Sequence, residues 1–208
     1  ASGTRSSASA SRISARPSAV EIGNSCSSDS IAQNGAGRVR TPSTHGRALA
    51  AGTGLKVARP DMTVLVTGGD GDGYSIGGNH FMHACRRNVD LTYIVMDNHV
   101  YGMTKGQASP TTEPDWDNKL SPGGTGVRAF NPLVVALAAG ANFVARGYSG
   151  DPNGTADLIA QGIRHPGFSF IEVLSPCVTF RPEQREWKQQ VHPATVAPTD
   201  DAARAAWS

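Results

Sequence analysis

The chain has 208 residues, which is enough for one domain with a full hydrophobic core. Its formal net charge of +2 is too small to indicate a nucleic-acid partner. No segment approaches the roughly 20 consecutive apolar residues that a membrane helix needs, so we expect no membrane association. The three cysteines are too few and too widely spaced for a disulfide framework, which favours a reducing, cytoplasmic setting.

Residues 1–19 differ in composition from the rest of the chain. They contain seven Ser, three Arg and no acidic residue. This composition is shared by organellar transit peptides and by disordered tails. We favour a disordered or non-native N-terminal tail.

From residue 46 onward, strand-like apolar segments alternate with helix-like segments, and one short apolar run precedes them. The short run "AVEI" (19–22) is a candidate parallel strand. The pattern then predicts helices at 46–59, 76–88, 131–139 and 154–163, strands at 63–67, 91–96, 142–146 and 168–174, and a polar loop at 99–129. Helices between short apolar strands predict a three-layer α/β domain over residues 20–180, with a mostly parallel sheet covered on both faces. Residues 181–208 are polar and are interpreted as a C-terminal tail that could dock on a partner.

Polar residues follow two neighbouring strands of this predicted sheet. The first strand leads into "GGDGDG", which contains Asp70, and the second ends in Asp97 and Asn98. Parallel strands place their carboxyl ends at one edge, so Asp70 and Asn98 are expected to be neighbours in space. A carboxylate and an amide oxygen are ligands that Mg²⁺ accepts beside a phosphate. The glycines would let the phosphate approach the backbone and the start of the next helix.

Other phosphate-binding motifs do not fit this segment. The pattern G-x-x-x-x-G-K-[ST] is absent, and G-x-G-x-x-G fails because Ile76 stands where the third glycine is required. A tight strand-to-helix turn without a ligand is the remaining alternative.

The segment from Gly69-Asp70-Gly71 to Asn98 resembles the thiamine-diphosphate motif. The surrounding sequence extends the likeness, with "HGRALAAGTGLKVARPDMTV", "MDNHVYGMTKGQASPTTEPDW" and "HPGFSFIEVLSPCVTFRPEQREW". These segments resemble the β subunit of 2-oxoacid:ferredoxin oxidoreductases, and most of all its 2-oxoglutarate branch. The resemblance covers roughly residues 44–190.

The resemblance implies a set of site residues. Mg²⁺ would be held by the side chains of Asp70 and Asn98 and by the carbonyl of Val100. Lys105 in "TKGQ" would meet the substrate carboxylate, although a solvated loop lysine is the alternative. Without the resemblance, His45 would be interpreted as a helix cap or surface residue. The implied thiamine-diphosphate contacts are Ser27, His45, Gly71, Asp72, Gly102 and Met103.

The family also carries a [4Fe–4S] cluster held by four Cys thiolates. Cys177 in "SPCVTF" matches one ligand, and Cys26 in "IGNSCSS" is a candidate for a second, with extra residues around it. The expected C-x-x-C is missing. Either other residues stand in its place at 1–19, or this copy lacks the cluster. Cys85 is predicted to pack as a small core residue.

The implied activity is oxidative decarboxylation of a 2-oxoacid with coenzyme A, passing electrons to ferredoxin. No residue is a candidate for the Glu that activates the aminopyrimidine ring, and the family places that domain on an α subunit. We therefore expect an active site shared with an α subunit. The alternatives are a non-catalytic remnant that keeps the fold and partner surface, and a cluster-free thiamine-dependent decarboxylase or ligase, which would not explain "SPCVTF" or "TKGQ".

Overall fold

A five-stranded parallel sheet forms the centre of the protein. The computed structural model describes residues 19–23 and 45–193. The order across the sheet is β1-β2-β3-β5-β4, and every neighbouring pair is parallel. The strands are β1 (Ala19–Gly23), β2 (Thr63–Gly69), β3 (Leu91–Asp97), β4 (Phe143–Tyr148) and β5 (Phe168–Leu174). The predicted strand at 19–22 is confirmed as the edge strand β1.

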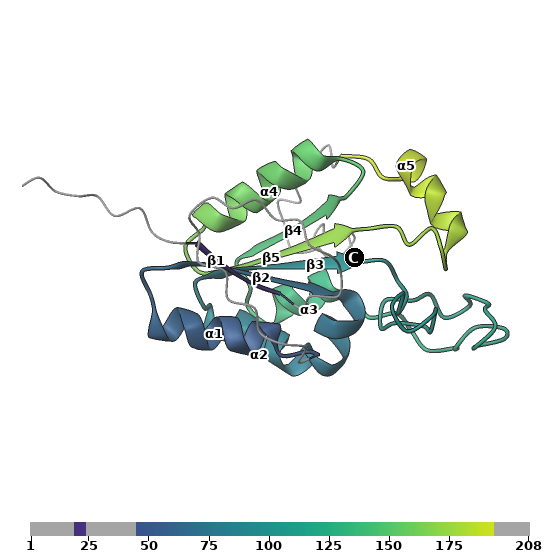
Figure 1. The fold of residues 1–208 in the computed structure, drawn as a ribbon, viewed down its shortest axis with the longest axis horizontal. Coiled ribbons are helices and arrows are strands. Elements are labelled where there is room, and N and C mark those ends of the chain that lie inside the picture. Colours follow the sequence, from purple (N-terminus) through teal and green to yellow (C-terminus); the bar gives the residue numbers. More distant parts are fainter. Residues whose placement is uncertain (1–18, 24–44, 194–208) are drawn as a thin grey trace, which may run out of the picture.

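Helices cover both faces of the sheet, so the predicted three-layer α/β fold is confirmed. Figure 1 shows α4 on one face and α1, α2 and α3 on the other. The helices are α1 (Ala48–Ala58), α2 (Gly78–Arg87), α3 (Pro132–Ala138) and α4 (Pro152–Arg164). No helix in the described ranges is both long and apolar enough to cross a membrane.

Local signals set several helix ends. The side chain of Asn131 accepts a hydrogen bond from the N–H of Val134 at the start of α3, and a proline follows at the first helical position. Asp151 caps α4 in the same way, by accepting from the N–H of Gly154 over 3.0 Å. At the end of α2, Asn88 adopts a left-handed conformation with φ 48°.

The larger hydrophobic core lies between the sheet and α1, α2 and α3. Phe81 of α2 and Phe170 of β5 are fully buried, with ring centroids 4.7 Å apart. Under α4, the smaller core contains Ile94, Ile171 and Val173. Cys85 packs in the larger core at 1% exposure, as predicted, and burial raises the pKa of its thiol to about 12.

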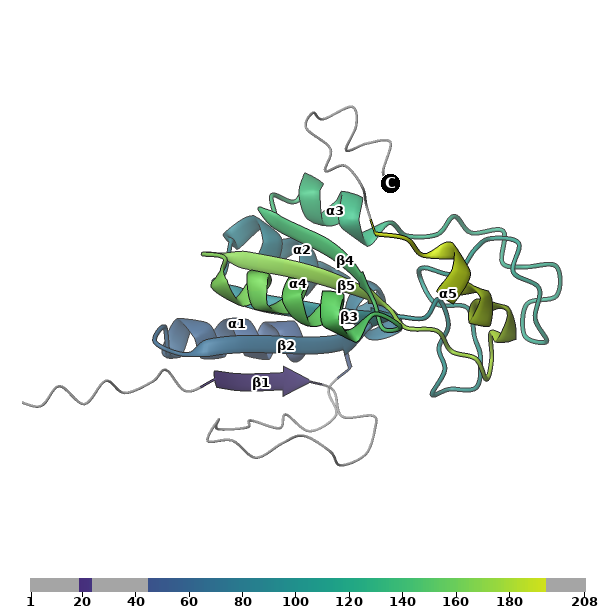
Figure 2. The ribbon, with the colours of Figure 1, turned by 90° about the horizontal axis from the view of Figure 1, so that it is seen from above.

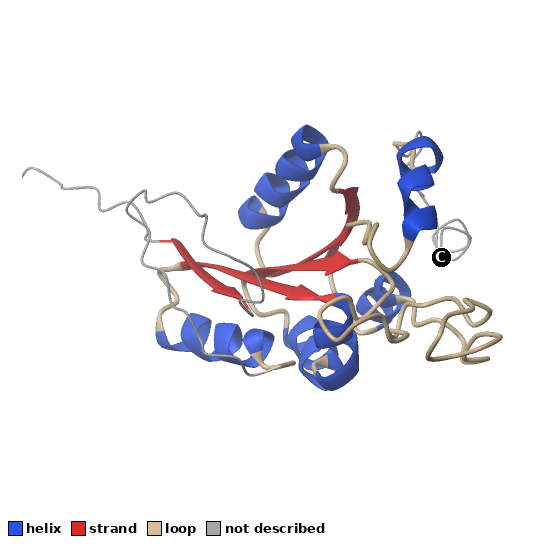
Figure 3. Cartoon of the chain, turned by 45° about the vertical axis from the view of Figure 1, so that its right-hand side comes forward, coloured by secondary structure: helices blue, strands red, loops and turns tan. Residues whose placement is uncertain are grey.

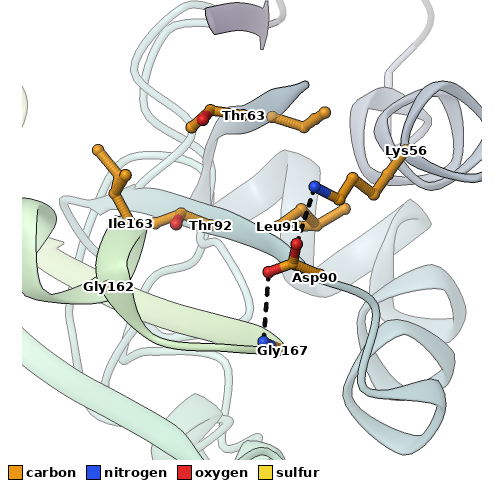
Figure 4. Close-up of a pocket in the computed structure, with 9 residues that line it drawn as sticks. Lys56, Thr63, Asp90, Leu91, Thr92, Gly162, Ile163 and Gly167 are labelled. Carbon is orange, nitrogen blue, oxygen red and sulfur yellow. Dashed lines mark hydrogen bonds and ion pairs between the residues drawn. The ribbon is translucent and has the colours of Figure 1, made fainter. Parts of the chain in front are cut away.

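The amino-terminal edge of the sheet is joined by an ion pair. Lys56 of α1 donates to Asp90 over 2.8 Å and to the carbonyl of Met62 over 2.7 Å. Asp90 also accepts the N–H of Gly167, which precedes β5 (Figure 4). This arrangement links α1, β3 and β5 at the edge of the sheet opposite the carboxyl ends of the strands.

The carboxyl-terminal edge carries most of the irregular structure. The loop at 98–131 and the segment at 175–190 both lie beyond the strand ends, as Figures 2 and 3 show. The segment contains two short helices, η2 (Pro182–Glu186) and α5 (Trp187–Gln190). The sequence had suggested a tail from residue 181, because a polar segment carries no apolar periodicity. In the structure, Arg181 and Gln184 are nevertheless buried.

Candidate functional site

Two aspartates lie side by side where β2 and β3 end. Gly69 pairs with Met96 in the sheet register, so Asp70 and Asp97 are the next residues on each chain. The hydroxyl of Thr111 lies 2.7 Å from Asp97 Oδ1 and 3.2 Å from Asp70 Oδ2. The prediction had paired Asp70 with Asn98. The register puts Asp97 level with Asp70, and Asn98 one residue further along the loop.

Both carboxyl groups are in an unfavourable environment for negative charge. Asp70 and Asp97 are 3% and 0% exposed. Burial, and then the charge of Asp97, raises the pKa of Asp70 to about 6. Burial raises the pKa of Asp97 to about 6 as well, although the nearby His99 opposes the shift.

Hydrogen bonding at this pair is incomplete. Thr111 has a single hydroxyl proton and cannot donate to both carboxylates at once. Among the described residues, the only buried side-chain polar atoms without a hydrogen-bond partner are Asp97 Oδ2 and the hydroxyl of Tyr74. A cation at this edge would stabilise both carboxylates, and the predicted Mg²⁺ fits this environment.

The oxygen donors available to such a cation are few. Within residues 19–23 and 45–193, no group of three or more His, Cys, Asp or Glu side chains is arranged to hold a metal. A magnesium site here would depend on Asp70 together with amide and backbone oxygens. The Asn98 side chain folds over its own loop, since its Oδ1 accepts the N–H of Val100 over 3.1 Å. Val100 is buried, and its carbonyl accepts one hydrogen bond, from the N–H of Gly102.

The turn after β2 is held close to the loop after β3. Residues Gly71–Ile76 form a π-helical turn, η1, ahead of α2, a form that is frequent at functional sites. Tyr101 donates its hydroxyl to the carbonyl of Gly71 over 3.3 Å. A methyl group on Gly71 would collide with the Tyr101 ring as it is placed here, so glycine lets this ring pack on the turn.

The turn before α1 reaches the same π-helical turn. The backbone N–H of Gly46 donates to Asp72 Oδ1 over 2.6 Å. This bond places the turn that contains His45 beside η1, and His45 is exposed. The structure therefore brings His45, Gly71 and Asp72, three predicted cofactor contacts, to one edge of the sheet.

The loop after β3 has an unusual backbone. His99 and Lys105 are non-glycine residues in the left-handed region, with φ values of 56° and 80°. Such conformations persist where the surrounding structure holds them. Met103 is 69% exposed and Lys105 is exposed, so both predicted contacts face solvent.

Cys177 packs on this loop. A methyl group built on Gly102 would lie 3.5 Å from the Sγ atom of Cys177 and 4.0 Å from the amide nitrogen of Asn98. The predicted position of Cys177 beyond β5, at the carboxyl edge, agrees with the structure. Ser27 and Cys26 lie outside the described residues, so their predicted roles stay predictions.

A polar network absent from the sequence analysis supports the same loop. His99 Nδ1 lies 2.9 Å from Glu113 Oε1, and Arg181 Nη1 lies 2.7 Å from Glu113 Oε2. Burial would raise the pKa of Glu113, but the hydrogen bonds with His99 and Arg181 outweigh it and lower the pKa to about 2. These residues come from an aperiodic loop and a polar segment, so no sequence pattern could identify them.

A cavity of about 360 Å³ with charged lining residues adjoins Asp97 on the side of α3. Arg146 and the fully buried Glu172 form an ion pair in its wall across strands β4 and β5. Its other charged lining residues are Asp97, His99, Glu113 and Arg128. Asp97 therefore lies between the loop after β3 and this cavity.

Comparison with protein families gives a match over most of the chain. Residues 30–173 match the family model described as thiamine pyrophosphate enzyme, C-terminal TPP binding domain. The "2-oxoglutarate synthase subunit KorB" of Archaeoglobus fulgidus is 50% identical over 136 residues, covering 65% of this chain and 51% of that protein. The "2-oxoacid:ferredoxin oxidoreductase subunit beta" of a Sulfolobus species is 47% identical over 144 residues, covering 69% of this chain and 47% of that protein.

A solved structure shares the fold. The 2-oxoglutarate:ferredoxin oxidoreductase of Magnetococcus marinus, with 2-oxoglutarate, coenzyme A and succinyl-CoA bound, superposes with a TM-score of 0.76 at 40% sequence identity. The match covers 88% of this chain and 63% of that one. The chain thus spans about half the length of the curated relatives described above.

Proposed function

This chain belongs to the thiamine pyrophosphate enzyme family, whose C-terminal TPP binding domain it matches, and from that premise we propose that it serves as the β subunit of a 2-oxoacid:ferredoxin oxidoreductase. It would provide the diphosphate-binding half of an active site completed by an α subunit. The observation that carries the proposal is the buried pair Asp70 and Asp97 at the ends of adjacent parallel strands, within a match to that subunit at 47–50% identity.

Each part of the edge has a role in this proposal. Asp70, the Asn98 side chain and the Val100 carbonyl would hold Mg²⁺, which would bind the diphosphate. The cofactor would be lined by Gly71, Asp72, Gly102 and Met103. His45 would be available to donate a hydrogen bond to a phosphate oxygen. When bound, thiamine diphosphate supplies the electron sink for decarboxylation.

We infer that 2-oxoglutarate is the preferred 2-oxoacid. The support is the loop containing Lys105 and the likeness to proteins named for 2-oxoglutarate. Lys105 is exposed on the loop that leaves the cofactor edge, so its ammonium is free to meet the distal carboxylate of a bound substrate. Pyruvate lacks that carboxylate and would gain nothing from this contact.

An iron–sulfur cluster does not fit the residues of this chain. The 208 residues contain three cysteines, and Cys85 is buried in α2 away from the strand ends. Cys26 and Cys177 could supply two thiolates, whereas a [4Fe–4S] cluster normally takes four. Coenzyme A, ferredoxin and the α subunit are proposed as partners, and the cytoplasmic setting stays a prediction from the cysteine usage.

Titration of the full chain, with and without a co-expressed α subunit, tests the proposal. Calorimetry should detect thiamine-diphosphate binding that requires Mg²⁺, and the complex should reduce a one-electron acceptor when 2-oxoglutarate and coenzyme A are both present. Cofactor binding by neither form would instead support the remnant that keeps the fold without the chemistry.

A further inference from the structure

We propose that Gln184 is a positioning residue that couples the loop bearing Cys177 to the loop bearing Asn98 and Val100. The inference rests on the proposed function, since the second loop is the one assigned to Mg²⁺ and the diphosphate. Gln184 belongs to η2, in the polar segment that follows the last strand, and it touches no cofactor atom in this scheme.

The side-chain amide of Gln184 uses both of its ends. Its Oε1 accepts the backbone N–H of Cys177 over 2.8 Å. Its Nε2 donates to the backbone carbonyl of Asn98 over 2.8 Å. The two partners lie 79 residues apart in sequence, in loops that follow β5 and β3, and one amide bridges them.

Burial makes this bridge costly to lose. Gln184 is 1% exposed, and few glutamines are buried to that extent. Removing one partner would leave a buried donor or acceptor unsatisfied. The amide therefore holds the main chain of Asn98 at one position, and that position sets where the Asn98 side chain and the Val100 carbonyl lie.

A neighbouring hydrogen bond strengthens the coupling between the two loops. Arg181, one turn before Gln184, donates to the carbonyl of His99 over 3.2 Å, so two consecutive carbonyls of the loop are held from the same segment. On the other side of the bridge, the Cys177 thiol faces Gly102 across a gap that a methyl group would fill. A shift of the Cys177 backbone would move the loop at Asn98 through the amide of Gln184.

Two substitutions separate the two halves of the bridge. In Gln184→Glu, the carboxylate accepts from Cys177 but cannot donate to Asn98 once it is ionised, so this variant is measured at alkaline pH, where burial no longer keeps the carboxyl group protonated. In Gln184→Met, a side chain of similar length makes neither bond. Gln189→Glu and Gln189→Met make the same chemical changes at an exposed position of α5 and serve as matched controls.

Hydrogen–deuterium exchange of the full-length chain, without cofactor, gives the first measurement. Gln184→Glu should speed exchange in peptides covering 98–107 while leaving the N–H of Cys177 protected, and Gln184→Met should speed both. The Gln189 variants should match the wild type. Unchanged exchange at 98–107 in both Gln184 variants would overturn the inference.

Calorimetric titration with thiamine diphosphate and Mg²⁺ gives the second measurement. Gln184→Glu should bind the cofactor roughly tenfold more weakly or worse, because the buried carbonyl of Asn98 loses its hydrogen-bond donor. The affinity of Gln189→Glu should stay within about twofold of the wild-type value. Equal affinity in Gln184→Glu and Gln189→Glu would also overturn the inference. A wild-type chain that binds no cofactor would refute the proposed function alone, and the exchange pattern would still decide whether Gln184 couples the two loops.

Discussion

Gly102 faces the Cys177 thiol across a gap that a methyl group would fill. A Cβ atom on Gly102 would stand 3.5 Å from the Cys177 Sγ atom, which is ordinary van der Waals contact, and Gly102 does not need a positive φ. The protein itself therefore does not require glycine here. If the cofactor approaches the backbone at this point, the ligand occupies the space that a side chain would otherwise fill.

Gly102→Ala should therefore separate folding from cofactor binding. We expect an unfolding free energy within about 0.5 kcal/mol of the wild type and roughly tenfold weaker thiamine-diphosphate binding, measured by urea titration and calorimetry. Gly54→Ala, at an open position of α1, is the control and should gain up to about 1 kcal/mol of stability. Unimpaired cofactor binding in Gly102→Ala would remove this residue from the site.

Asp70→Asn should stabilise the metal-free chain and abolish metal-dependent cofactor binding. The buried Asp70 carboxylate lies beside the Asp97 carboxylate. Asn carries no charge, so the substitution removes both the cost of burying the charge and the repulsion between the two carboxylates, and the unfolding free energy should rise by about 2 kcal/mol. Chemical denaturation and calorimetry measure the two effects. Asp115→Asn, an exposed change in the neighbouring loop, should alter neither. A variant that binds as tightly as the wild type would contradict the assignment of Asp70 to the metal.

Lys105→Met should impair 2-oxoglutarate turnover far more than pyruvate turnover. A charge-assisted contact to the distal carboxylate is worth about 1.5–3 kcal/mol, so kcat/KM for 2-oxoglutarate should fall roughly tenfold or more. Lys119→Met changes another exposed lysine of the same irregular region and is the control. Equal losses on both substrates would refute a role for Lys105 in specificity.

Lys56→Met should destabilise the fold without touching the cofactor. The substitution removes both the ion pair with Asp90 and the hydrogen bond to the Met62 carbonyl, at a cost of about 1 kcal/mol because Asp90 is largely exposed. Thermal unfolding should show the loss, while thiamine-diphosphate affinity should be unchanged. Lys188→Met, an exposed change in α5, should leave the unfolding midpoint in place.

Glu113 should contribute to the acid sensitivity of the protein. Its pKa is lowered to about 2, so its contribution to stability is complete above the unfolded value of about 4.5 and is lost as pH falls towards 2. The stability difference between the wild type and Glu113→Gln, measured by urea unfolding, should shrink as pH is lowered from about 5 to about 3. A difference independent of pH would show that the hydrogen bonds, and not the charge of Glu113, matter. Glu186→Gln is the exposed control.

Periodic segments made the layers of this fold predictable. The predicted strand at 168–174 matches β5 residue for residue, because an apolar run lies there between Gly167 and the Ser175-Pro176 pair. The placement of Asp70 at the carboxyl edge also followed from the βαβ rule alone. Helix 76–88 was predicted with a start that missed η1, since a π-helical turn has no pattern of its own.

Sheet register and loop contacts could not be predicted. Apolar strands that are buried on both faces pair equally well in several registers by pattern, so nothing indicated that Asp97 would lie level with Asp70. Thr111 lies in a loop without a periodic pattern, and its contact with both aspartates depends on tertiary packing. Gln184 is polar and follows the last strand, where composition suggests a tail and only packing shows a buried amide.

Among the strands that the structure describes, the last to be synthesised occupies an interior position of the sheet. β5 lies between β3 and β4, and within residues 19–23 and 45–193 β4 pairs with β5 alone. During translation β4 therefore emerges from the ribosome with no neighbour to pair with, and it must wait until residue 174 has left the exit tunnel. The sheet is completed late and through contacts distant in sequence, which is a slow and aggregation-exposed way to fold. A nascent chain halted before residue 168 should remain open and protease-sensitive, and it should gain protection in one step once β5 can insert.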